Sequence, residues 1–294
     1  MAHTSVLLEE VLEGLNPSPG EVHVDATAGG GGHSRKIIER ISPKGTFVGI
    51  DLDPQRIEEL KQGLSGAKLK DLILVNGNYA DVAKILKEND LDRANGLLVD
   101  LGFSSDQLGN GRGFSFKGKE EPLLMTYSDD APPLYQVLPT LGEKVIAQII
   151  KDLSDERYAR RIAKAIVERR REKRILTNHD LADVVKQAVP SNYEKGRINP
   201  ATRTFMAFRI YINKELENLG KLLGQLTETM APGGKVAIIS YHSKEDEMVK
   251  GTFLDMVHQG QAELITKRAI RPSVQEVQDN PRSRSAKLRI IEMK

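Results

Sequence analysis

Apolar runs without polar alternation, separated by amphipathic stretches, dominate the first hundred residues. Four of these runs are predicted to be strands, at residues 21–25, 46–51, 72–75 and 96–100. The first two are followed by predicted helices, over 34–41 and 54–64. Continuous apolar strands that alternate with helices indicate a parallel sheet covered on both faces. The pattern therefore predicts an α/β protein with a doubly wound sheet.

The alternation stops after residue 100, where a Gly-, Ser- and Asp-rich stretch leads into purely helical patterns. Apolar residues at helical spacing then predict one long helix from about residue 199 to about 230. A final set of predicted elements follows it: strands at 235–240, 263–266 and 287–291, and a helix at 244–257. We expect one α/β domain, formed by residues 1–107 and 199–294, with a helical insertion at 108–198.

Composition narrows the class of protein. The 294 residues contain 43 Lys and Arg, 41 Asp and Glu and no Cys, so disulfides and thiolate metal sites are excluded. The six histidines show no metal-ligand spacing, and we expect no metal. No apolar run approaches the roughly 20 residues of a membrane span, and acidic residues within the first fifteen argue against a signal peptide. These features predict a cytoplasmic protein that does not bind membranes.

A glycine-rich segment, DATAGGGGHS at Asp25–Ser34, joins the first strand to its helix. Consecutive glycines let the backbone approach a ligand closely, and a helix start offers free N–H groups. The spacing is not that of the dinucleotide fingerprint, since Ser34 occupies its last glycine position. A ligand-binding loop is favoured over a flexible turn.

Carboxylates follow two of the strands. Asp51 ends the second strand, where an acid can bind a ribose hydroxyl pair, whereas Asp53 precedes Pro54 and is explained as a helix cap. Asp100 ends the fourth strand, where it can face a cofactor and accept a hydrogen bond from a substrate amine, although it could also cap the next turn. These residues indicate a nucleoside-containing cofactor without separating NAD from S-adenosylmethionine.

Two segments are strongly basic, residues 156–174 and 267–289. In the first, four basic residues share one helical face: Arg157, Arg161, Lys164 and Arg171. Such clusters are typical of a polyanion-binding surface, and an ordinary solvated face is the alternative. His242 follows a predicted strand, where a capping role and a substrate contact stay equally open.

The chain resembles one family through several long stretches, among them DATAGGGGHSRKI, GLLVDLGFSSDQL, NPATRTFMAFRIYIN and APGGKVAIISYHSKED. It is the family of bacterial 16S ribosomal RNA cytosine N4-methyltransferases (RsmH, also called MraW). The resemblance implies a class I S-adenosylmethionine methyltransferase fold with an inserted helical domain. It also implies N4-methylation of cytidine 1402 in 16S ribosomal RNA, with that RNA or the small ribosomal subunit as partner. Independently of the resemblance, a homodimer is one expected assembly.

The resemblance also assigns residues. Cofactor contacts fall on Gly31, Gly32, His33, Asp51, Tyr79, Asp100 and Gln107. Apart from the resemblance, the place of Asp100 at a strand end makes it the expected catalytic residue. The expected substrate-binding residues are the basic Arg157, Arg161 and Lys164, together with Arg203 and His242.

The chain departs from the family at one segment, where the family pattern is P-L-D-M-R-M-D. In this chain Leu124 replaces the first acid, Thr126 replaces the arginine and Ser128 replaces the last acid. These replacements leave two further hypotheses open, a non-catalytic RNA-binding or assembly protein on a methyltransferase scaffold, and a methyltransferase with another substrate.

Overall fold

A computed structural model describes residues 5–102, 111–128 and 131–294. The chain forms two compact units, one made of residues 1–102 and 216–294 and the other of residues 103–215. The second unit extends beyond the expected insertion at 108–198, because α10 (Ala201–Ile212) packs against α7 (Glu143–Ser154). We call them the sheet unit and the helical unit.

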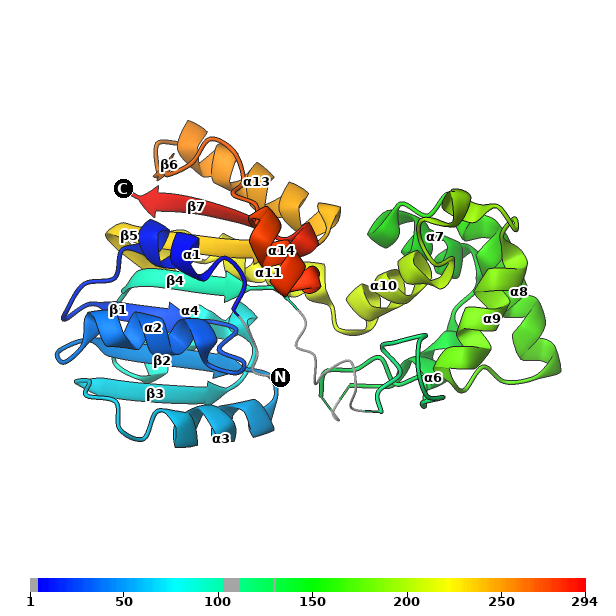
Figure 1. Ribbon diagram of the computed structural model, residues 1–294, viewed down its shortest axis with the longest axis horizontal. Helices are drawn as coiled ribbons and strands as arrows, with labels where there is room; N and C mark the ends of the chain where they lie inside the picture. Colours follow the sequence, from blue (N-terminus) through cyan, green and yellow to red (C-terminus); the bar gives the residue numbers. More distant parts are fainter. Residues whose placement is uncertain (1–4, 103–110, 129–130) are drawn as a thin grey trace. The chain divides into compact units, whose positions relative to one another are not determined.

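The sheet unit contains seven strands in the order β3-β2-β1-β4-β5-β7-β6. Their bounds are β1 Val22–Asp25, β2 Thr46–Asp51, β3 Asp71–Asn76, β4 Ala94–Asp100, β5 Met230–Ser240, β6 Ala262–Leu264 and β7 Lys287–Met293. Strands β1 to β5 pair in parallel, whereas β7 runs antiparallel to β5 and β6, as the opposed arrowhead of β7 shows (Figure 1). The predicted doubly wound α/β fold is confirmed.

Helices cover both faces of this sheet. One face packs against α1 (Leu8–Leu15), α2 (Gly32–Ile41) and α3 (Pro54–Gly63), and the other against α4 (Val82–Glu88), α11 (Glu215–Gly224) and α13 (Ser243–His258). Leu97 and Leu98 in β4 lie in opposite core clusters, and both are fully buried. Neighbouring strand residues point to opposite faces, so a sheet covered twice requires the continuous apolar run seen in the sequence. The remaining short elements of this unit are η1 Tyr79–Asp81, α12 Leu226–Thr229, α14 Val274–Asp279 and η4 Pro281–Ser285.

The helical unit has its own hydrophobic core, which includes Ile146, Ile162, Leu181 and Phe208. Besides α7 and α10 it contains α6 Leu134–Val137, η2 Leu138–Thr140, α8 Ala159–Glu172, α9 Asn178–Ala188 and η3 Tyr193–Gly196. A capping box between Thr177 and Asp180 starts α9. No helix in the described part of the chain is long and apolar enough to cross a membrane.

The prediction of a single long helix from about residue 199 to about 230 is wrong. The structure has separate helices α10 and α11 in this segment, and between them Lys214 has a positive φ of 52°. The cause is Asn213, whose amide donates to the carbonyl oxygen of Met125 (2.8 Å) and accepts from the backbone N–H of Tyr127 (2.9 Å). This tertiary contact outweighs the local helical periodicity, which gives no sign of a partner 86 residues away.

Candidate functional site

Three aspartates mark the carboxyl ends of adjacent strands in the sheet unit. Asp25 ends β1 and pairs in register with Gly49 of β2 and Leu98 of β4. Asp51 and Asp100 each lie two residues beyond those partners, so they extend past Asp25 on either side of the loop that follows β1. The strand order changes direction between β1 and β4, and this is where open α/β sheets bind ligands.

The loop after β1 requires its glycines. Gly29 and Gly31 have φ values of +49° and +76°, which few residues with a side chain adopt. A Cβ at Gly31 would lie 2.5 Å from Leu60 Cδ1, and one at Gly32 would lie 1.9 Å from Ser5 Oγ. The first turn of α2 thus begins with bare backbone, whose N–H groups have no acceptor within the helix.

Asp51 ties this loop to β2. Its two carboxylate oxygens accept hydrogen bonds from the backbone N–H groups of Gly29 (2.9 Å) and Asp53 (2.9 Å). Burial raises the pKa of the Asp51 carboxyl above its ordinary value, and these two donors oppose the shift. The side chain of Asp53 accepts from the N–H of Gln55 (2.9 Å) and caps α3, as its position before Pro54 predicted.

These features fit the adenosine part of a cofactor. A carboxylate offers about four lone-pair sites, so Asp51 keeps acceptor capacity for a ribose hydroxyl pair after binding two backbone donors. The N–H of Gly29 bonds directly to Asp51 Oδ2, so the glycine loop and the acid are adjacent. Loop and acid therefore suit a nucleoside ligand in geometry and in chemistry.

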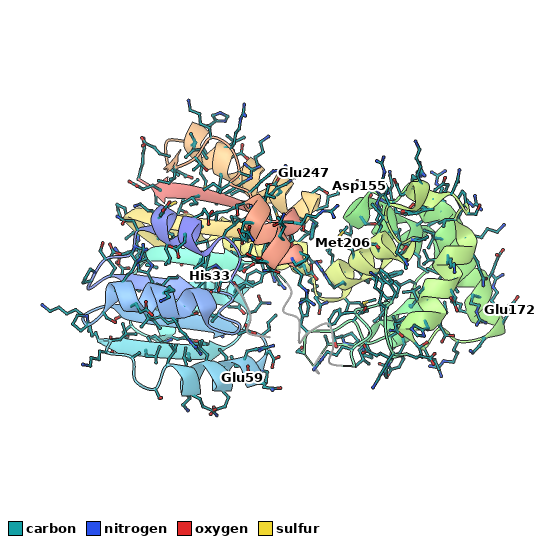
Figure 2. The ribbon with its side chains drawn as sticks, in the orientation of Figure 1. His33, Glu59, Asp155, Glu172, Met206 and Glu247 are labelled. Carbon is teal, nitrogen blue, oxygen red and sulfur yellow. The ribbon has the colours of Figure 1, made fainter. Side chains whose placement is uncertain are left out.

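The other expected cofactor residues are found in different settings. His33, labelled in Figure 2, lies in the first turn of α2, and its buried ring donates from Nε2 to the carbonyl oxygen of Val6 (3.0 Å). The side chain of His33 thus holds the N-terminal segment, and the part of His33 that could contact a ligand is its backbone N–H. Tyr79 is half-buried and begins η1, after β3. Gln107 lies outside the described residues.

Asp25 is a buried acid that the sequence did not single out. It is 2% exposed and accepts hydrogen bonds from Ser34 Oγ (2.7 Å) and from the N–H of Thr27 (3.2 Å). Burial raises the pKa of its carboxyl to about 6, and its two donors oppose this shift. The Thr27 hydroxyl in turn accepts from the N–H of Asp100 (2.7 Å), so this loop also connects to the end of β4.

Asp100 has a neighbour that the sequence analysis missed. Oδ1 of Asp100 accepts from the N–H of Gly102 (3.0 Å), and the phenol ring of Tyr241 lies against that glycine, where a Cβ would be 2.8 Å from its hydroxyl oxygen. Burial raises the pKa of Tyr241, and the charge of Asp100 raises it further. Tyr241 follows Ser240 at the end of β5, the strand beside β4. The available signal in the sequence was its position directly after a predicted strand.

Three of the expected substrate-binding residues are exposed on the helical unit. Arg161 and Lys164 lie in α8, and Arg157 lies two residues before the helix. The guanidinium groups of Arg157 and Arg161 lie 4.8 Å and 5.8 Å from the ring centroid of Tyr158. Lys164 Nζ is 3.7 Å from a carboxylate oxygen of Glu168, an exposed ion pair of little energetic value.

Arg203 belongs to a more enclosed network. Its guanidinium donates to Glu194 (3.0 Å) and lies 4.0 Å from Glu156, whose side chain is fully buried. Glu156 also accepts from the backbone N–H of Tyr158 (2.7 Å) and from the hydroxyl of Tyr193. Arg203 therefore already helps to compensate a buried charge, and its predicted substrate contact would come in addition.

Other basic residues have structural partners. Arg170 donates to the carbonyl oxygens of Leu138 (2.7 Å) and Leu141 (2.8 Å). Lys287 and Arg289 both bind the carboxylate of Asp246, at 2.8 Å and 2.7 Å. Counting basic residues therefore overstates both basic clusters.

His242 caps α13. Its Nδ1 accepts from the N–H of Glu245 (3.3 Å), and the Glu245 carboxylate accepts from the N–H of His242 (3.2 Å), which forms a capping box. Of the two roles left open by the sequence, this geometry provides the capping one. The substrate contact of His242 stays a prediction.

Comparison with known proteins agrees with this geometry. The sequence profile of the MraW methylase family matches residues 1–294. Ribosomal RNA small subunit methyltransferase H of Syntrophotalea carbinolica is 40% identical, over 98% of this chain and 97% of that protein. The proteins of the same name from Coprothermobacter proteolyticus and Clostridioides difficile are 40% and 39% identical and are matched over 95% and 98% of their lengths. The protein described here is thus a member of the MraW methylase family.

Proposed function

We propose that this protein transfers a methyl group from S-adenosylmethionine to the exocyclic amine, N4, of a cytidine in small-subunit ribosomal RNA, at position 1402. The observation that carries the proposal is the placement of Asp51, the glycine loop and Asp100 at one edge of the sheet in a member of a methylase family. Relatives that match nearly the whole chain bear the name of a small-subunit RNA methyltransferase, which supports the substrate class.

Each part of the edge has a distinct role. Asp51 would bind the ribose hydroxyls, and the backbone of Gly31, Gly32 and His33 would approach the rest of the cofactor. Tyr79 and Gln107 are proposed as further contacts. When bound, S-adenosylmethionine supplies an electrophilic methyl group on a positively charged sulfur.

Asp100 is proposed to act on the amine. The lone pair of the cytosine amine is delocalised into the ring, so the nitrogen is a weak nucleophile. A carboxylate that accepts a hydrogen bond from this amine favours its reactive, pyramidal form and can take up the proton lost after transfer. Holding the amine in contact with the methyl group supplies the other large part of the rate.

The helical unit is proposed to bind the RNA. Arg157, Arg161 and Lys164 are exposed and would contact phosphates, with Arg203 and His242 as further substrate contacts. The residues that replace the family acid and arginine belong to this unit. The side chain of Thr126 is buried, with the residue 3% exposed, and its hydroxyl accepts a hydrogen bond from Arg112 (3.4 Å), so this departure contributes to the packing of the unit. The target base must leave its stack, or be single-stranded already, to reach the sheet unit.

The deciding experiment is nucleoside mass spectrometry of 16S ribosomal RNA and of small subunits, incubated with protein and S-adenosylmethionine. We expect N4-methylcytidine at one position. A methyl group on another base would overturn the substrate assignment. RNA binding without any methylated product would favour the non-catalytic alternative, and methylation of small molecules alone would favour another substrate. The homodimer and the cytoplasmic location stay predictions, which light scattering and cell fractionation test.

A further inference from the structure

The second basic segment, residues 267–289, belongs to the sheet unit and has no part in the proposed function so far. Its basic residues are of two kinds. Lys287 and Arg289 bind the carboxylate of Asp246, which is 8% exposed, so their charges are compensated within the fold. Four others are exposed and form no ion pair with any residue that the structure describes: Lys267, Arg268, Arg271 and Arg284.

The only two acids of this segment have donors of their own. A carboxylate oxygen of Glu276 accepts from the backbone N–H of Leu7 (2.8 Å), and the carboxylate of Asp279 accepts from the side-chain amide of Gln275 (3.1 Å). Neither acid forms an ion pair with a described basic residue. The segment therefore presents an excess of positive charge to solvent.

The register of the sheet places both ends of this segment at the edge that carries Asp100. Asp100 of β4 pairs with Ile239 of β5, and Ile239 pairs with Leu288 of β7. Leu288 in turn exchanges two backbone hydrogen bonds with Ile270, each 2.9 Å long. Ile270 thus lies on the same row as Asp100, three strand spacings or about 14 Å away.

A second set of contacts places the middle of the segment near the glycine loop. Glu276 lies in α14, and its hydrogen bond with the N–H of Leu7 joins this helix to the N-terminal segment. The carbonyl oxygen of the adjacent Val6 accepts from the ring of His33, in the first turn of α2. Figure 1 shows α14 at the end of the sheet toward which the arrowhead of β4 points.

The fold also holds the basic side chains outward. Ser283 in η4 is fully buried, and its hydroxyl donates to the carbonyl oxygen of Asn280 (2.8 Å), which anchors this turn. The next residue, Arg284, is exposed. Arg271 is exposed directly after Ile270, the residue that pairs with β7. Guanidinium groups held on a fixed backbone without acids of their own suit phosphate groups, which they can bind through two parallel hydrogen bonds.

We propose that Lys267, Arg268, Arg271 and Arg284 form a phosphate-binding surface on the sheet unit, which holds the RNA strand beside the target cytidine. This inference rests on the proposed function for the identity of the RNA, and it adds a binding surface to the one proposed for the helical unit. Phosphate contacts fix the register of a strand without reading its sequence. A surface about 14 Å from Asp100 lies within a few nucleotides of the base that reacts.

The test measures how the full-length chain binds a labelled fragment of 16S ribosomal RNA that contains the target cytidine, by fluorescence anisotropy at several salt concentrations. Arg271→Gln and Arg284→Gln are combined. We expect affinity to fall about 10-fold and the logarithmic salt slope to flatten by about one to two units. Lys44→Gln combined with Arg93→Gln is the matched control, because it removes two exposed positive charges that precede β2 and β4, at the opposite edge of the sheet. It should leave the slope nearly unchanged.

Val274→Glu tests the same surface without removing an arginine. Val274 is 77% exposed in α14, so the substitution loses little packing and the melting temperature should stay unchanged. The added negative charge should weaken RNA binding about 3-fold or more and, in methylation assays, raise the KM for RNA while kcat is kept.

These outcomes separate the surface from the reaction. A wild-type salt slope in the double arginine variant, or an equal loss of affinity in the control, would overturn the inference. A wild type that makes no methylcytidine, but whose RNA binding depends on Arg271 and Arg284 as expected, would refute the proposed function alone.

Discussion

Charged side chains are buried and hydrogen-bonded at the end of the sheet, whereas they are exposed on the surface of the helical unit. At the sheet edge, Asp25 and Asp51 are largely removed from water and accept hydrogen bonds from named donors. On the helical unit, Arg157 and Arg161 are exposed and lie over an aromatic ring, and Lys164 forms an exposed ion pair. The edge suits one small ligand of fixed shape, whereas the surface suits a flexible polyanion.

This difference has a physical reason. A buried charge costs several kcal/mol unless its partners are in place, so the edge must be built before any ligand arrives. An exposed arginine costs little and gains most of its binding energy when counterions leave the partner. Substitutions at the edge should therefore act on cofactor and chemistry, and substitutions on the surface on RNA affinity and its dependence on salt.

The largest effect is expected from Asp100→Ala. It removes the proposed acceptor for the amine, and we expect the maximal rate to fall about 100-fold or more, the usual scale of a lost acid–base contact. Single-turnover assays at saturating S-adenosylmethionine separate the two proposed roles of Asp100. Full recovery of the rate at saturation would mean that Asp100 serves the cofactor only. Asp255→Ala, at an exposed position of α13, is the control.

Asp51→Ala tests the same edge through binding alone. We expect S-adenosylmethionine affinity to weaken by about 1–3 kcal/mol, the cost of losing a charged hydrogen-bond acceptor. Asp53→Ala is a close control, because its side chain caps α3. It should lower stability by about 1 kcal/mol and leave affinity nearly unchanged. Calorimetry with NAD completes the test, and preferential binding of NAD would contradict the cofactor assignment.

Asp25 predicts how stability depends on pH. Its pKa is raised from 3.8 to about 6 on folding, so between these values the folded state holds a proton that the unfolded chain has lost. Its contribution to the free energy of unfolding therefore falls as pH rises through this window, by on the order of 1–3 kcal/mol.

Urea unfolding at about pH 4 and pH 7 measures this contribution. Asp25→Asn cannot ionise, so the loss of stability between the two pH values should be smaller than in wild type by that amount. Ser34→Ala keeps the carboxyl and removes a donor to its charged form, so it should enlarge the loss. Identical pH dependence in all three proteins would show that Asp25 is not the titrating group.

The sequence predicted the sheet well because its information is local. The strand at Thr46–Asp51 and the cap at Asp53 follow from neighbouring residues alone, and the structure contains both. Other features depend on residues far along the chain. The interruption of the helix at Asn213 needs a partner segment near Met125, and the electrostatic influence of Asp100 on Tyr241 joins two strand ends. Periodicity carries no information about such pairs, since they exist only after the chain has folded.

The same limit explains the basic residues. Composition marked residues 156–174 as one basic segment, yet within it Arg170 binds two carbonyl groups and Arg169 lies 3.9 Å from Asp180. Only partners seen in the folded chain distinguish a basic residue that supports the unit from one that is available to RNA. Substitutions can distinguish the supporting basic residues from the available ones, and the effects expected from these substitutions are the smallest.

Replacing Arg157 and Arg161 together by Gln should reduce RNA affinity about 10-fold and flatten its logarithmic dependence on salt by about two units, one for each lost phosphate contact. Arg170→Gln is the control from the same segment. It should lower the melting temperature, because two carbonyl groups lose their donor, and leave the salt slope unchanged. Thermal stability of the double variant must be measured as well, since both guanidinium groups cover the ring of Tyr158. If the double variant binds RNA with the wild-type salt slope, these arginines form an ordinary solvated face. A binding role would then be supported for the sheet edge and not for this surface.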